Sequence, residues 1–98
     1  MKKIYICSPF RRNIKHNTKL AKHWAVEIIR QGNLPIAPHL YFPLFLNDDN
    51  EYERELGIKF GLKLLKICDE VWVYGEPTEG MKKEIQRAKK LRKKIVYK

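Results

Sequence analysis

The sequence predicts an α/β fold built around a parallel sheet. Short segments rich in β-branched and aromatic residues alternate with longer segments whose apolar residues recur at helical spacing, which is typical of βαβ units. No internal repeat or interdomain linker interrupts this alternation. We therefore expect a three-layer sandwich of the flavodoxin-like or Rossmann-like kind, with four or five parallel strands. At 98 residues, it should form one domain that spans residues 1–98.

The first half of the chain predicts a strand, a helix and a second strand. The segment "KKIYIC" (residues 2–7) has the composition of a strand. After a loop, residues 17–32 predict a helix, with Asn17 as its N-cap and Gly32 as its C-terminal stop. The segment "LPIAP" (residues 34–38) predicts a short strand.

The second half repeats the pattern after a long loop at residues 39–50. Residues 51–69 predict a second helix and residues 70–75 a third strand. Thr78 can cap a third helix, which continues through the lysine-rich segment "MKKEIQRAKK". Residues 94–98 predict a final short strand.

The chain is strongly basic, with a formal net charge of +10. This charge favours anionic partners such as phosphates or nucleotides. Much of it lies in the C-terminal run "KKEIQRAKKLRKK", which a solvated helix face explains equally well. Nucleic acid is an unlikely partner on this reasoning, because no aromatic residues are interleaved with the basic residues of the third helix.

Other features restrict the class of protein further. No apolar run approaches the roughly 20 residues that a membrane span needs, so we expect no membrane association. Cys7 and Cys68 lack the spacing of metal ligands, and nothing suggests secretion. We therefore expect reduced thiols, a cytoplasmic protein and no metal site.

In a parallel sheet, ligands bind beyond the carboxyl ends of the strands. The loop "SPFRRN" lies at this edge, where its backbone amides with Arg11 and Arg12 suit an anionic group, although an arginine-rich surface turn is the alternative. The loop that contains His39 and Tyr41 could stack on a base, or could pack as a lid on its own core or on a second subunit. At "TEGM", Gly80 permits close backbone approach to a ligand, while a simple helix cap is the plainer interpretation.

Glu84 lies on the third helix beside its apolar stripe, among residues such as Ala88 and Leu91. It could be a rim glutamate that pairs with a neighbouring arginine or lysine. It could also face a cleft together with Tyr5, whose phenol would orient the carboxylate. A single, oriented and partly desolvated carboxylate can attack a sugar carbon whose leaving group is a base.

Three segments of the chain carry a family resemblance: "IYICSPFRR", "CDEVWVYG" and "TEGMKKEIQRA". In this order they resemble the nucleoside 2-deoxyribosyltransferase superfamily, which includes the 2′-deoxynucleoside 5′-phosphate N-hydrolases. More narrowly, the chain is similar to the small, uncharacterised phage and bacterial branch of that superfamily.

The resemblance implies roles for individual residues. Glu84 falls on the catalytic glutamate, which attacks the anomeric carbon, and Tyr5 falls on the tyrosine that orients it. Thr78 falls on a position that contacts substrate, and Ser8 and Arg11 fall in the loop that surrounds the substrate phosphate in the hydrolases.

The chain departs from the family pattern at Gly61, where the family usually has an aspartate that holds a sugar hydroxyl. Our leading hypothesis is cleavage or transfer at the N-glycosidic bond of a nucleoside, a nucleotide or a nucleotide-derived signal, without a cofactor. The alternative is a non-catalytic module that binds nucleotides or ADP-ribose-like messengers, which Gly61 favours. At this size an exposed aromatic loop suggests a homodimer or larger homo-oligomer, and the resemblance implies that neighbouring subunits complete each other's pocket. The predicted site comprises catalytic Glu84 and Tyr5, and substrate-binding Ser8, Arg11, Arg12, His39, Tyr41, Thr78, Gly80 and Met81.

Overall fold

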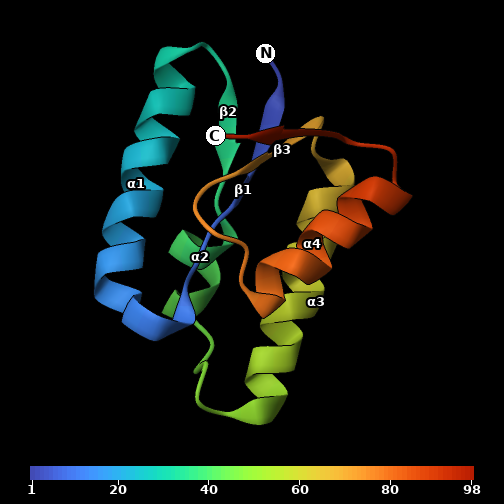
Figure 1. Ribbon diagram of the computed structural model, residues 1–98. Helices are drawn as coiled ribbons and strands as arrows, with labels where there is room; N and C mark the ends of the chain where they lie inside the picture. Colours follow the sequence, from blue (N-terminus) through green and yellow to red (C-terminus); the bar gives the residue numbers. More distant parts are fainter.

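The computed structural model of the protein describes residues 1–98 and contains one sheet of four strands. The strands are β1 (Lys3–Cys7), β2 (Leu34–Ile36), β3 (Glu70–Val73) and β4 (Lys94–Tyr97). They lie in the order β2-β1-β3-β4, and every neighbouring pair is parallel (Figure 1). The predicted parallel sheet is therefore confirmed, with four strands.

Helices cover both faces of this sheet. One face carries α1 (Ile14–Arg30), and the opposite face carries α3 (Glu51–Ile67) and α4 (Glu79–Lys90), as Figure 1 shows. This arrangement is the predicted three-layer α/β sandwich. None of the helices combines the length and the apolar character that a membrane crossing requires.

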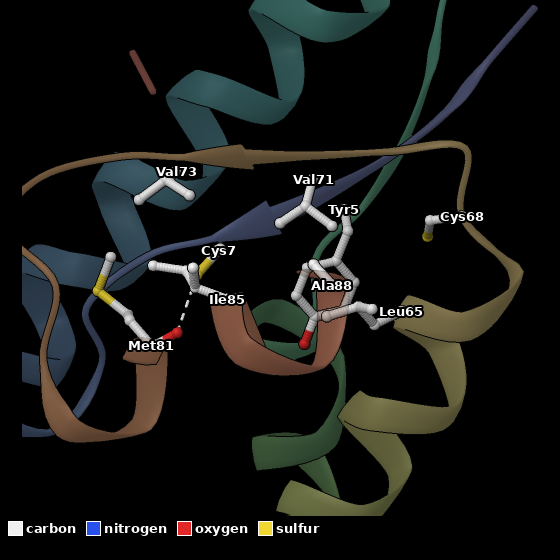
Figure 2. Packing of buried hydrophobic residues seen from close by; sticks show 9 residues of the cluster. All are labelled: Tyr5, Cys7, Leu65, Cys68, Val71, Val73, Met81, Ile85 and Ala88. Carbon is white, nitrogen blue, oxygen red and sulfur yellow. Dashed lines mark hydrogen bonds between the residues drawn. The ribbon is translucent and has the colours of Figure 1, made fainter. Parts of the chain in front are cut away.

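The two faces of β1 have separate cores, because successive side chains of a strand point to opposite sides. Ile4 and Ile6 pack toward α1, with Ile28 and Trp72. On the other face, Tyr5 and the residues around it pack toward α3 and α4 (Figure 2). This second cluster consists of Tyr5, Cys7, Leu65, Cys68, Val71, Val73, Met81, Ile85 and Ala88.

The start of α1 differs from the prediction. Asn13, and not Asn17, is the N-cap, and its side chain accepts a hydrogen bond from the backbone N–H of His16 at 3.3 Å. Asn17 lies one turn inside the helix, where its side-chain amide donates to the carbonyl of Phe10 at 3.1 Å. The sequence offers an asparagine at both positions, and a 3₁₀ turn, η1 (Arg11–Asn13), brings the earlier one to the helix end.

The predicted long loop at residues 39–50 is also partly wrong. It contains the short helix α2 (Pro38–Tyr41) and a 3₁₀ turn, η2 (Phe42–Leu44). A proline lies at the start of each of these turns, where its fixed φ suits a helix and its missing N–H costs nothing. The prolines that we read as strand and loop residues therefore begin helical turns.

The strand order places a topological switch point between β1 and β3. The chain leaves β1 toward β2 on one side, and later returns to add β3 on the other side. Connections after β1 and β3 therefore diverge at the carboxyl edge of the sheet and leave a crevice between them. The loop after Cys7 and the turn that leads into α4 both border this crevice.

Candidate active site

A cleft of about 930 Å³ lies at this carboxyl edge. Its walls come from the loop after β1, the α2–η2 segment, one side of α3 and the first turns of α4. Tyr5 and Glu84 both line it; Tyr5 comes from β1 and Glu84 from α4, the helix that follows β3. The position agrees with the edge that the sequence predicted.

Glu84 and Tyr5 are in direct contact. The Tyr5 hydroxyl donates a hydrogen bond to Oε2 of Glu84. Tyr5 has no exposed surface, so the rest of its side chain is fixed by the core between the sheet and the helices (Figure 2). The other carboxylate oxygen, Oε1, lies 3.5 Å from the thiol of Cys7. Both oxygens of Glu84 are thus held from β1.

No cation balances the charge of Glu84. None of the ion pairs in the protein includes it, so the alternative of a rim glutamate paired with Arg87 or a lysine is not what the structure contains. Burial raises the pKa of Glu84 to about 7, and the hydrogen bonds from Tyr5 and Cys7 only partly oppose this. Burial and the nearby Glu84 charge also raise the pKa of Tyr5 well above its usual value. The phenol therefore stays protonated and donates.

Gly61 of α3 faces this pair closely. A Cβ atom built on Gly61 would lie 3.2 Å from the Tyr5 hydroxyl and 4.0 Å from Oε2 of Glu84. Gly61, where the family resemblance led us to expect an aspartate, therefore lies beside the Glu84 carboxylate. In this chain the wall of the cleft at that point is backbone alone.

Ser8 follows β1 and lies at the floor of the cleft. It is 1% exposed, and its hydroxyl has no hydrogen-bond partner in the chain. Buried hydroxyls are almost always bonded, so an unpartnered one beside a cleft points to a ligand group.

His39 holds the loop that contains Ser8. The Nε2 atom of His39 lies 3.1 Å from the Ser8 carbonyl, and the imidazole stacks on Phe10 with 4.7 Å between ring centroids. Because a carbonyl only accepts, the ring carries its proton on Nε2. Burial lowers the pKa of His39, so the ring is held neutral. We considered two alternatives for this loop, stacking on a base or packing on the protein itself, and the His39 ring packs against Phe10.

The first turn of α4 forms the opposite side of the cleft. Thr78 caps this helix, as predicted, by accepting from the backbone N–H of Met81 at 3.3 Å. A Cβ added at Gly80 would meet open space. The Met81 side chain packs in the core. Met81 borders the cleft because it lies on the first turn of α4.

The two arginines of the first loop differ. Both line the cleft, but Arg11 forms an ion pair with Asp48, with 2.8 Å between Nε and Oδ2. Arg12 has no carboxylate partner in the protein. Of the two guanidinium groups, that of Arg12 is therefore the one available to a ligand.

Tyr41 does not line the cleft. It is 55% exposed and packs edge-on against Phe42 and Phe45. The prediction placed it with His39 because the two are close in sequence, but the turns of α2 and η2 direct it outward.

Sequence reasoning considered Cys7 only as a reduced thiol and missed its contact with Glu84. Its place two residues after Tyr5 was the available signal, because alternate residues of a strand share a face. No group of three or more His, Cys, Asp and Glu side chains is placed to hold a metal ion.

Comparison with known proteins agrees with this fold. The chain is similar in structure to a 2-deoxyribosyltransferase from the psychrotolerant bacterium Bacillus psychrosaccharolyticus, with a TM-score of 0.78 and 18% sequence identity. The similarity covers 97% of this chain and 70% of that one. The protein thus has the α/β fold found in a 2-deoxyribosyltransferase.

At the level of sequence, the chain belongs to the family described as a domain of unknown function, DUF7768, which matches residues 2–98. No curated protein matches it.

Proposed function

We propose that the protein cleaves or transfers the N-glycosidic bond of a nucleoside or nucleotide, with Glu84 as the nucleophile. The observation that carries this proposal is the Glu84 carboxylate, which is partly buried at a large cleft, bonded to the Tyr5 hydroxyl and free of any counter-ion. The fold shared with a 2-deoxyribosyltransferase supports it.

The chemistry follows from the state of this carboxylate. Cleavage of an N-glycosidic bond develops positive charge on the sugar ring, and a desolvated carboxylate without a cation interacts with that charge strongly. An oxygen of Glu84 then forms a bond to the anomeric carbon, and the base leaves with the electron pair of the C–N bond. Water or a second base resolves the glycosyl-enzyme and regenerates the carboxylate.

An anionic end of the substrate fits the part of the cleft that is lined by Ser8, Arg12 and Gly80. The unpartnered Ser8 hydroxyl can donate to a phosphate oxygen, and the α4 N-terminus at Gly80 offers backbone N–H groups in open space. The unpaired Arg12 adds a charged donor. A nucleoside monophosphate therefore suits the cleft better than a free nucleoside.

Chromatography of free base tests the proposal. The wild-type protein is incubated with deoxynucleoside monophosphates, and separately with NAD-type dinucleotides, with and without a second free base. We expect base release or exchange that Glu84→Gln abolishes. Glu55→Gln is the matched control, because Glu55 is an exposed glutamate of α3 that does not line the cleft. Equal release by wild type and Glu84→Gln would refute the role of Glu84.

A second candidate function rests on Gly61. Because no side chain stands there to hold a sugar hydroxyl, the same cleft could serve as a non-catalytic module for nucleotides or ADP-ribose-like messengers. Isothermal titration separates the two functions. Tight binding of a nucleotide without release of base over many hours supports the module.

We also propose that a second copy of the chain covers the surface beside the cleft formed by Tyr41, Leu44 and Phe45. These three side chains are 55–74% exposed, which is unusual for a cluster of large apolar residues. Light scattering should give at least a dimer, and Phe45→Ser should shift the mass toward the monomer. A monomeric wild type at high concentration would exclude this assembly.

A further inference from the structure

Cys7 is the buried group beside the candidate nucleophile that the proposed chemistry leaves unused. It has no exposed surface, and its Sγ lies 3.5 Å from Oε1 of Glu84 and 3.8 Å from the carbonyl oxygen of Met81. Figure 2 shows Cys7 and Tyr5 projecting from the same face of β1, with the Cys7 thiol next to Met81.

The thiol is unsuited to act as a nucleophile or a redox group. Burial, followed by the charge of Glu84, raises the pKa of Cys7 far above its usual range. The group therefore remains an S–H donor throughout the neutral range. A thiol has one hydrogen and two candidate acceptors here, and the ionised carboxylate is both the closer and the more strongly attracting one.

We propose that Cys7 is a positioning residue that fixes the second carboxylate oxygen of Glu84, so that Tyr5 and Cys7 together set the orientation of the carboxylate. Tyr5 alone would leave Glu84 free to rotate about one hydrogen bond. With the thiol on Oε1, the plane of the carboxylate is defined from one rigid strand. The inference rests on the proposed function for its catalytic meaning, but the contact itself can be tested without substrate.

The surroundings of Glu84 make its titration simple to interpret. From β1 it is faced by Tyr5 and Cys7, both of which stay protonated near neutral pH. From α3 it is faced by Gly61, and a Cβ built on that glycine would also lie 4.0 Å from Pro38 of α2. No other titratable group is in hydrogen-bond contact with it, so a change at Cys7 near neutral pH reports on Glu84.

Infrared spectroscopy of the S–H stretch tests the contact directly, because proteins have little other absorption in that region. Cys68→Ala leaves Cys7 as the only thiol, and the wild type carries the same band beside that of Cys68. We expect the Cys7 band to move to lower frequency as Glu84 ionises, with a midpoint near 7. In Glu84→Gln the band should not move with pH. A band that ignores pH in the wild type, or moves equally in Glu84→Gln, overturns the proposal.

A pair of cysteine variants separates positioning from packing. Cys7→Ala and Cys68→Ala remove the same atoms from the same core cluster, but Cys68 donates to the carbonyl of Leu64 and not to Glu84. Carboxyl-carbon NMR should show the Glu84 midpoint rising by roughly half a pH unit, about threefold in proton affinity, in Cys7→Ala alone. Equal midpoints in the two variants would overturn the proposal. If base release is detected, its pH midpoint should also rise in Cys7→Ala. Absence of base release in the wild type counts against the proposed function only, and not against the contact between Cys7 and Glu84.

Discussion

Replacing Glu84 with glutamine should make the protein more stable at high pH relative to the wild type. Burial raises the pKa of Glu84 from its usual 4.5 to about 7. Between these values the folded state binds a proton that the unfolded state has lost, so the free energy of unfolding falls as the pH rises through this window. Each pH unit corresponds to about 1.4 kcal/mol, so the full effect reaches roughly 3 kcal/mol.

Urea denaturation, followed by tryptophan fluorescence, measures this effect at a series of pH values from below 4.5 to above 7. The quantity of interest is the difference in unfolding free energy between Glu84→Gln and the wild type, since other titrations cancel in it. This difference should grow by up to roughly 3 kcal/mol across the window in favour of the variant. Glu55→Gln, on the exposed side of α3, is the matched control for the loss of a glutamate charge.

A constant difference between Glu84→Gln and the wild type would refute the reasoning. It would mean that Glu84 titrates as a solvated carboxylate. The same result would also count against Glu84 as the nucleophile. A strong interaction with the positive charge of the transition state requires a poorly solvated carboxylate.

Four other substitutions have expected outcomes. Gly61→Ala brings a methyl group to 3.2 Å from the candidate site's phenol and should reduce base release by at least tenfold, measured by chromatography, with a smaller loss of stability. Thr78→Ala removes the cap of α4 and should cost about 1 kcal/mol in urea denaturation. Glu70→Ala leaves the buried indole N–H of Trp72 without its acceptor at 2.9 Å and should cost about 1–3 kcal/mol in urea denaturation. Lys2→Ala, from the exposed end of the same network, should cost less than Glu70→Ala.

The succession of strands and main helices along the chain could be predicted from the sequence, because each element has a clear period and a recognisable stop. The β1 segment alternates between two buried faces, and the apolar stripe of α4 is sharp against its lysines. The errors lie where two residues compete for one local role. Asn13 and Asn17 are both suitable caps for α1, and only the preceding 3₁₀ turn selects Asn13.

Helical phase placed Glu84 beside an apolar stripe, where it could face a cleft with Tyr5 or lie at the rim, and the family resemblance favoured the pair. The contacts around the pair were not predictable from the sequence. The distance from Gly61 to the phenol depends on how closely α3 approaches the sheet, and the thiol contact of Cys7 depends on the height of α4 above β1. Such distances are set by packing between elements far apart in the sequence, which periodicity does not encode.

The isolation of Glu84 is notable because the chain has so many cations to offer. With a formal net charge of +10, and with Arg12, Arg54 and Lys83 all lining the same cleft, an ion pair to this carboxylate would be easy to build. An ion pair would lower the pKa of Glu84 and stabilise the folded state, but it would also neutralise the charge. The hydrogen bonds from Tyr5 and Cys7 orient the carboxylate and leave most of its charge available. In the proposed reaction that charge meets a partner only when the glycosidic bond breaks and the sugar becomes positive, so the folding free energy lost at Glu84 is recovered in the transition state.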